Sequence, residues 1–336
     1  MTFEKIFTDL KAKKFAPVYF LEGDEPYYIE AIADFIEENA LDESEKSFNQ
    51  TILYGKETEV ETILENAKRF PMMSEKQVVV VKEAQNIKNI ESLHHYFASP
   101  LASTILVICY KDKTIDKRKK EGKALAQEAQ KNGVLFTSKK LYDNQLPDWI
   151  TQRVKEAGMT INLKTATVLA EFLGNDLSRI VNEIEKLALL IEKGKEIDLD
   201  TVEKNIGVSK EFNNFELVSA LVKKDVYKVF QIAAYFSKNP SKHPLVLTLG
   251  ILYGLFSKLI LYHYLQNKSK ENVASVLKVN PYFTSDYQVG ASNYSIKKSV
   301  EAIAILREYD KKSKGIHSPP IEQGELLKEM LYKLLN

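Results

Sequence analysis

The chain has 336 residues, enough for two or three domains, and its 44% apolar and 28% charged fractions are ordinary for a globular protein. A formal net charge of +1 excludes a global field that recruits nucleic acid, so any such contact must come from a local patch. The single cysteine, Cys109, excludes an internal disulfide, and the N-terminus lacks the pattern of a signal peptide. These features together favour a cytoplasmic protein.

Residues 18–30 read as an apolar strand, a tight turn and a helix, the layout of the phosphate-binding loop G-x-x-x-x-G-K-[ST]. Gly23 fits the first glycine, but Tyr28, Ile29 and Glu30 stand where the second glycine, the lysine and the hydroxyl belong. A phosphate cradle needs close backbone N–H groups and a cation, and these three side chains supply neither. We therefore expect a degenerate loop that does not bind nucleotide, with no catalytic residue and no cofactor.

The first part of the chain, residues 1–141, alternates apolar strands with helical stretches. Strands are predicted at residues 16–21, 50–54, 77–81, 104–109 and 134–136, and helices at residues 27–38, 59–67 and 90–98. This alternation predicts an α/β domain with a parallel sheet and helices on both faces.

The strand at residues 77–81 ends in Lys82 and Glu83, the position of the acidic pair that holds magnesium in an active ATPase. Lys82 replaces the first acid, so this motif is degenerate as well. Taken alone, the segment also fits an ordinary core strand that ends in charged residues. Two damaged motifs in the expected order favour a nucleotide-binding fold without its activity.

Two short segments are candidate contact surfaces. Phe70, Pro71, Met72 and Met73 lie between a predicted helix and the third strand, where two methionines form either part of the core or an exposed apolar plug. Lys117, Arg118, Lys119 and Lys120 follow the fourth strand and form either a solvated loop or a patch that touches DNA phosphates.

After residue 141 the strand pattern stops and helices follow, first in a small domain over residues 142–209 and then in a larger one over residues 210–336. The apolar run at residues 244–265 is long enough to span a bilayer, but Lys258 lies within it. We interpret it as the buried central helix of a helical domain. No histidine spacing indicates a metal site.

Four segments in this order resemble the delta subunit family of the bacterial replicative polymerase's clamp loader. They are the strand and loop at residues 18–27, the charged stretch at 112–120, the run at 146–150, and the helix spanning residues 173–187. The resemblance covers nearly the whole chain and is weakest in residues 210–336, where it consists mainly of helical character.

The resemblance implies an AAA+-like domain over residues 1–141, a helical lid-like domain over 142–209, and a helical collar over 210–336 that joins other loader subunits. It implies a subunit that does not hydrolyse ATP, binds the sliding clamp through the segment Phe70–Met73, and opens one clamp interface for loading on primed DNA. It implies no membrane contact. An active ATPase of the same fold and a non-replicative helical scaffold are the alternatives.

Overall fold

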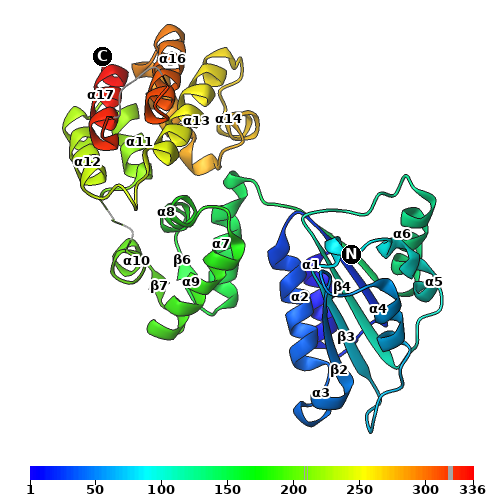
Figure 1. The fold of residues 1–336 in the computed structure, drawn as a ribbon. Helices are drawn as coiled ribbons and strands as arrows, with labels where there is room; N and C mark the ends of the chain where they lie inside the picture. Colours follow the sequence, from blue (N-terminus) through cyan, green and yellow to red (C-terminus); the bar gives the residue numbers. More distant parts are fainter. Residues whose placement is uncertain (208, 210, 317–320) are drawn as a thin grey trace. The chain divides into compact units, whose positions relative to one another are not determined.

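The computed structural model describes residues 1–207, 209, 211–316 and 321–336 (Figure 1). The chain forms two compact units, Met1–Leu141 and Tyr142–Asn336. The first unit has a sheet with flanking helices and the second is almost entirely helical, so the predicted order of an α/β part followed by helical parts is confirmed.

The sheet of the first unit has five parallel strands in the order β2-β3-β4-β1-β5. The strands are β1 (Val18–Gly23), β2 (Gln50–Tyr54), β3 (Gln77–Lys82), β4 (Thr104–Lys111) and β5 (Val134–Ser138). Because every strand runs the same way, all carboxyl ends meet at one end of the sheet and all amino ends at the other. The two candidate sites described below lie at these opposite ends.

Helices cover both faces of this sheet (Figure 1). They are α1 (Phe3–Lys11), α2 (Pro26–Asn39), α3 (Glu43–Asn49), α4 (Val60–Ala67), α5 (His94–Phe97) and α6 (Lys120–Asn132), with the short 3-10 helices η1 (Ala84–Asn86) and η2 (Ile90–Leu93). The sequence predicted α2, α4 and a helix at residues 90–98, where η2 and α5 lie, but not α1, α3 or α6.

Alternating strand residues divide the first unit into two cores. Tyr19 and Leu21 of β1 pack with α1 and α2 on one face, whereas Val18 and Phe20 pack with α4 and α6 on the other. Cys109 of β4 belongs to the first of these cores, and burial raises the pKa of its thiol to about 12. The thiol is therefore a core side chain and not a nucleophile.

In the second unit, helices follow one another along the chain. They are α7 (Leu146–Glu156), α8 (Leu163–Leu173), α9 (Leu177–Leu190), α10 (Leu199–Ile206), α11 (Asn214–Val222), α12 (Val226–Lys238), α13 (Leu245–Tyr264), α14 (Lys270–Leu277), α15 (Thr284–Asn293), α16 (Ile296–Ser313) and α17 (Gln323–Leu335), with η3 (Asp143–Gln145) and η4 (Pro281–Phe283). Two short parallel strands, β6 (Thr160–Ile161) and β7 (Glu196–Ile197), were not predicted because two residues show no periodicity. At the predicted boundary between residues 209 and 210, residue 210 lies outside the described residues.

Helix α13 is the one helix of the described residues that is long and apolar enough to cross a membrane by length and composition. One side of it is buried, where Leu252, Phe256 and Leu259 belong to the main core of the second unit. It packs against α15, α16 and α17 within that unit. Its apolar character is therefore explained by its place as a core helix of a helical unit.

Candidate functional site

The turn after β1 packs closely against Ser138 at the end of β5. Gly23 has φ of +127°, and a Cβ added there would lie 2.2 Å from the carbonyl oxygen of Ser138, so no other residue fits without a shift. The next two main-chain N–H groups are already used, because Asp24 donates to the Ser138 carbonyl (3.3 Å) and Glu25 donates to the Ser138 hydroxyl (3.2 Å). These two donors are therefore bonded to β5.

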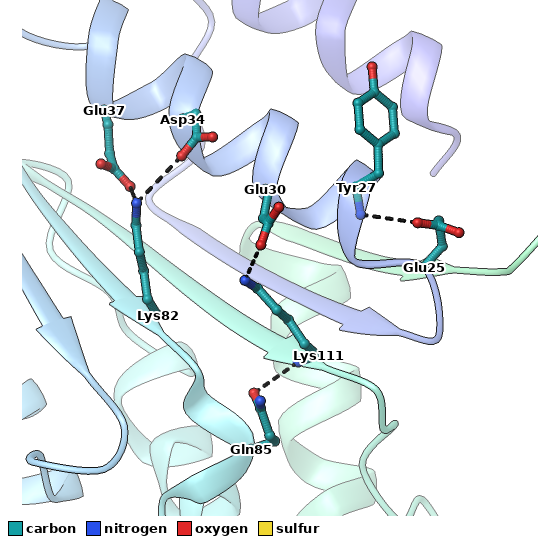
Figure 2. Close-up of polar contacts among 8 residues, drawn as sticks. All are labelled: Glu25, Tyr27, Glu30, Asp34, Glu37, Lys82, Gln85 and Lys111. Carbon is teal, nitrogen blue, oxygen red and sulfur yellow. Dashed lines mark hydrogen bonds and ion pairs between the residues drawn. The ribbon is translucent and has the colours of Figure 1, made fainter. Parts of the chain in front are cut away.

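The N-terminus of α2 is capped by a residue of the same turn. Glu25 is the N-cap residue, and its carboxylate Oε1 accepts a hydrogen bond from the Tyr27 N–H at 3.2 Å (Figure 2). Pro26 occupies the first helical position, where it has no N–H to offer. A carboxylate thus lies at the helix N-terminus, where an incoming phosphate would carry the same charge.

The three predicted substitutions in the loop have structural roles. Ile29 is fully buried in the core beneath α2, so its position cannot direct a side chain toward a ligand. Tyr28 packs edge-on against Phe3 with ring centroids 4.7 Å apart. Glu30 forms an ion pair with Lys111 at the end of β4. The degenerate loop of the sequence analysis is therefore built into the fold of the unit.

Two lysines lie at the carboxyl end of the sheet and both pair with acids of α2 (Figure 2). The Lys82 Nζ lies 2.9 Å from the Glu37 carboxylate and 3.5 Å from that of Asp34. Burial lowers the pKa of Lys82, but these two carboxylates outweigh burial and leave the pKa above its usual value. Lys111, which the sequence analysis did not single out, pairs with Glu30, and its main-chain N–H donates to Gln85 Oε1 at 3.2 Å.

The second residue of the degenerate acidic motif lies apart from these pairs. Glu83 adopts a left-handed conformation with φ of +55°, and its carboxylate lies 3.7 Å from the Lys56 Nζ. Among the described residues no group of three or more His, Cys, Asp or Glu side chains could hold a metal ion. The carboxyl end of the sheet is therefore a set of internal ion pairs.

The segment between α4 and β3, which we call the tip (Phe70–Met73), has the opposite character. Phe70 is 80% exposed, Met72 is 55% exposed and Met73 is fully exposed, while Pro71 is half-buried. The interpretation of the two methionines as core residues is therefore wrong. Three large apolar side chains next to one another in solvent are typical of a contact surface.

The backbone of the tip is held although its side chains are free of the core. The Gln77 carboxamide at the start of β3 donates to the carbonyl of Arg69 and to the Thr104 hydroxyl, the latter at 2.9 Å. From the other side, the buried Asn49 at the end of α3 hydrogen-bonds both main-chain groups of Met72. The tip therefore lies at the amino ends of β2 and β3, the end of the sheet opposite Lys82.

The basic run contains one residue whose charge is engaged inside the unit. Glu22 of β1 is fully buried, and its carboxylate accepts from the Ile115 N–H (2.9 Å), from the Thr137 hydroxyl (3.0 Å) and from Lys117 Nζ (3.0 Å). A buried carboxylate needs such partners. Lys117 therefore has a structural role that the charge pattern did not reveal.

The other three basic residues lie at the surface. Arg118 donates to both carboxylate oxygens of Asp116 at 2.9 and 3.1 Å, so its charge is locally matched. Lys119 and Lys120 are exposed at the start of α6, where Lys119 is the N-cap residue. All four residues of the predicted patch are thus exposed, and two of them, Lys117 and Arg118, are ion-paired within the unit.

Comparison with known proteins shows what the chain is similar to. A family model described as DNA polymerase III, delta subunit, matches residues 19–137, and a model described as a middle domain matches residues 142–204. The DNA polymerase III subunit delta of Bacillus subtilis is 27% identical over 323 residues, which cover 92% of this chain and 91% of that protein. A protein described as probable DNA polymerase III subunit delta of Aquifex aeolicus is 24% identical over 226 residues, 64% of this chain and 62% of its own length.

Solved structures agree with the sequence comparison. The structure of the Bacillus subtilis DNA clamp loader delta protein matches 99% of this chain and 99% of its own, with a TM-score of 0.59 and 26% sequence identity. The match spans the α/β unit that carries both sites and the helical unit that follows it. By sequence and by fold, the chain is similar to bacterial DNA polymerase III delta subunits along nearly its whole length.

Proposed function

We propose that this chain is a clamp-loader delta subunit that binds the sliding clamp through the tip and opens one clamp interface, so that the clamp can be loaded on primed DNA. The observation that carries the proposal is the tip itself: Phe70, Met72 and Met73 are exposed while the backbone beneath them is fixed by hydrogen bonds. A fixed apolar projection enters a pocket with little loss of conformational freedom.

The size of the tip supports a contact that dominates binding. Burial of an exposed methionine side chain contributes about 1.5–3 kcal/mol, so two methionines contribute roughly 3–5 kcal/mol. Since each 1.4 kcal/mol changes an affinity about tenfold, their loss weakens binding more than about 100-fold. Methionine is flexible and polarisable, which suits a pocket on another protein.

Clamp opening then follows from a shift in populations. A subunit that binds the opened or strained interface better than the closed one favours opening by that difference in affinity. We expect no nucleotide hydrolysis by the isolated chain, because Ile29 and Lys82 stand where the phosphate-binding lysine and the first acid belong. ATP bound by neighbouring loader subunits would expose or hide the tip.

The remaining parts of the chain take their roles from the family. Residues 142–209 form the lid-like domain, and residues 210–336 form the collar through which the other loader subunits assemble. Of the basic run, Arg118, Lys119 and Lys120 are the residues available to primed DNA within the complex, because Lys117 is paired with the buried Glu22. The complex acts in the cytoplasm.

A pull-down with purified sliding clamp tests the proposal. Met72→Ala combined with Met73→Ala should abolish capture of the clamp while assembly with the other loader subunits is retained. The matched control is Leu189→Ala with Leu190→Ala, an adjacent pair of exposed apolar residues at the end of α9, which should bind normally. Undiminished capture by the methionine variant would refute the site.

The two alternatives make different predictions. An active ATPase would bind magnesium nucleotide in a titration of the isolated chain. We expect no such binding, because Lys82 and Lys111 are already paired with acids of α2. A non-replicative scaffold would join helical partners through residues 210–336 and would not capture the clamp with either the native or the mutated tip.

A further inference from the structure

Asn49, the last residue of α3, is connected to the tip by a pair of hydrogen bonds. Its Nδ2 donates to the Met72 carbonyl at 2.9 Å, and the Met72 N–H donates to Asn49 Oδ1 at 2.7 Å. The Nδ2 also donates to the carbonyl of Glu45 at 3.3 Å, which ties the amide to its own helix. Asn49 is only 4% exposed, so water does not compete for these bonds.

This arrangement requires an asparagine. One side chain must present a donor and an acceptor at the same distance from the backbone, as a peptide group does in a sheet. Aspartate would keep the acceptor for the Met72 N–H but lose the donor, and alanine would lose both. The next residue, Met73, has a left-handed backbone with φ of +54°, which costs about 1 kcal/mol for a residue with a Cβ. Such a conformation persists when its neighbours are fixed.

Phe48 precedes Asn49 on α3 and is 64% exposed. Successive residues of a helix point about 100° apart, so Phe48 can face solvent while Asn49 faces inward. Because Asn49 bonds directly to Met72, the end of α3 that carries Phe48 lies beside the tip. Two separate segments thus present exposed apolar side chains at the amino ends of β2 and β3.

We propose that Asn49 is a positioning residue that holds the tip in its clamp-binding form, and that Phe48 is a further contact residue for the clamp. The proposal rests on the proposed function, since both roles require that the tip binds the clamp. Phe48 on α3 and the tip should contact the same partner, because the hydrogen bonds of Asn49 hold the two segments side by side.

Asn49 is tested by Asn49→Ala and Asn49→Asp in the full chain, with clamp affinity and amide hydrogen exchange measured together. We expect Asn49→Ala to weaken clamp binding about tenfold and to speed exchange in residues 70–76, with exchange in β3 and β4 unchanged; Asn49→Asp should lie between it and wild type. Faster exchange at the tip with unchanged affinity would overturn the positioning role. Faster exchange throughout the sheet would show a merely structural role and would overturn it too.

Phe48 is tested by Phe48→Ala and Phe48→Leu. Because the side chain is exposed, both variants should unfold at the wild-type temperature, while Phe48→Ala binds the clamp about tenfold more weakly and Phe48→Leu about twofold. Tyr54→Ala is the matched control, since Tyr54 is an exposed aromatic at the far end of β2, about 16 Å along the strand from Asn49. Wild-type affinity of Phe48→Ala, or an equal loss in Tyr54→Ala, would overturn the contact.

The methionine variant separates this inference from the function on which it rests. If the tip variant loses clamp binding while those at Phe48 and Asn49 keep it, the proposed function stands and the further inference fails. If the Met72→Ala, Met73→Ala variant itself binds normally, both fail. If all of them weaken binding in the order given by the size of the lost contact, both are supported.

Discussion

The two ends of the sheet in the α/β unit differ in how their side chains are paired and exposed. At the carboxyl ends, Lys82 and Lys111 are neutralised by acids of α2, and the turn after β1 is closed by hydrogen bonds to Ser138. At the amino ends, the backbone of the tip is equally well bonded, but the side chains of Phe70, Met72 and Met73 remain in solvent. At the carboxyl ends the charged groups are paired within the unit, whereas at the amino ends large apolar side chains are exposed.

Strand β3 joins the two ends directly. It begins at Gln77, which holds the tip, and ends at Lys82, which pairs with α2; five residue steps of a strand span about 16 Å. The difference teaches that one strand can end in paired charges at one end of a sheet and support exposed apolar side chains at the other.

The largest expected difference between the two ends of the sheet comes from placing one lysine at each end. Ile29→Lys restores the lysine of the phosphate loop, but Ile29 is fully buried, so the free energy of unfolding should fall by more than about 3 kcal/mol. Met73→Lys places the same charge on a fully exposed residue and should change stability by less than about 0.5 kcal/mol while abolishing clamp binding. Urea unfolding measures the free energy of unfolding of both variants. An Ile29→Lys variant as stable as wild type would contradict the assignment of Ile29 to the core.

The ion pairs at the carboxyl end should contribute moderately. Lys82→Met removes the cation that faces Glu37 and Asp34, and because the pair is partly exposed we expect a loss of about 1 kcal/mol, smaller in 1 M salt. The pKa of Lys82 is raised in the folded state, so its contribution is fully present below the unfolded pKa and is lost as pH rises through the folded pKa. The difference between variant and wild type should therefore be constant from about pH 6 to 9 and shrink only in strong alkali.

The smallest expected effect is that of nucleotide. Magnesium ATP should leave the unfolding temperature of the isolated chain unchanged, because the turn donors and the helix N-terminus are already bonded. A ligand at a hundred times its dissociation constant would add about 2.7 kcal/mol, which a thermal melt detects readily. A reproducible upward shift would indicate an occupied site and would reverse the contrast between the two ends.

Much of this arrangement follows from local sequence patterns. Apolar runs predicted β3 at residues 77–81 and the long helix at 245–265, which the structure gives as Gln77–Lys82 and Leu245–Tyr264. The prediction of a degenerate phosphate loop also rests on local sequence, because the motif fixes which position should hold each residue. Such features depend on neighbours within one element.

The missed features depend on partners far away in the chain. Lys117 pairs with Glu22 across 95 positions, and Lys111 with Glu30 across 81, and no local pattern reveals either. Helix α3 was missed because it is short and polar, and with it Phe48 and Asn49. One local signal existed: Asp42 followed three residues later by Glu45, whose carboxylate accepts from the Asp42 N–H at 3.1 Å, marks the start of a helix.

Titration of the full chain with purified sliding clamp, with and without magnesium ATP, tests the central claim most directly. We predict one dissociation constant under both conditions, and a value more than about 100-fold weaker for the Met72→Ala, Met73→Ala variant. An affinity that depends on nucleotide in the isolated chain, or that survives the loss of both methionines, would contradict the account.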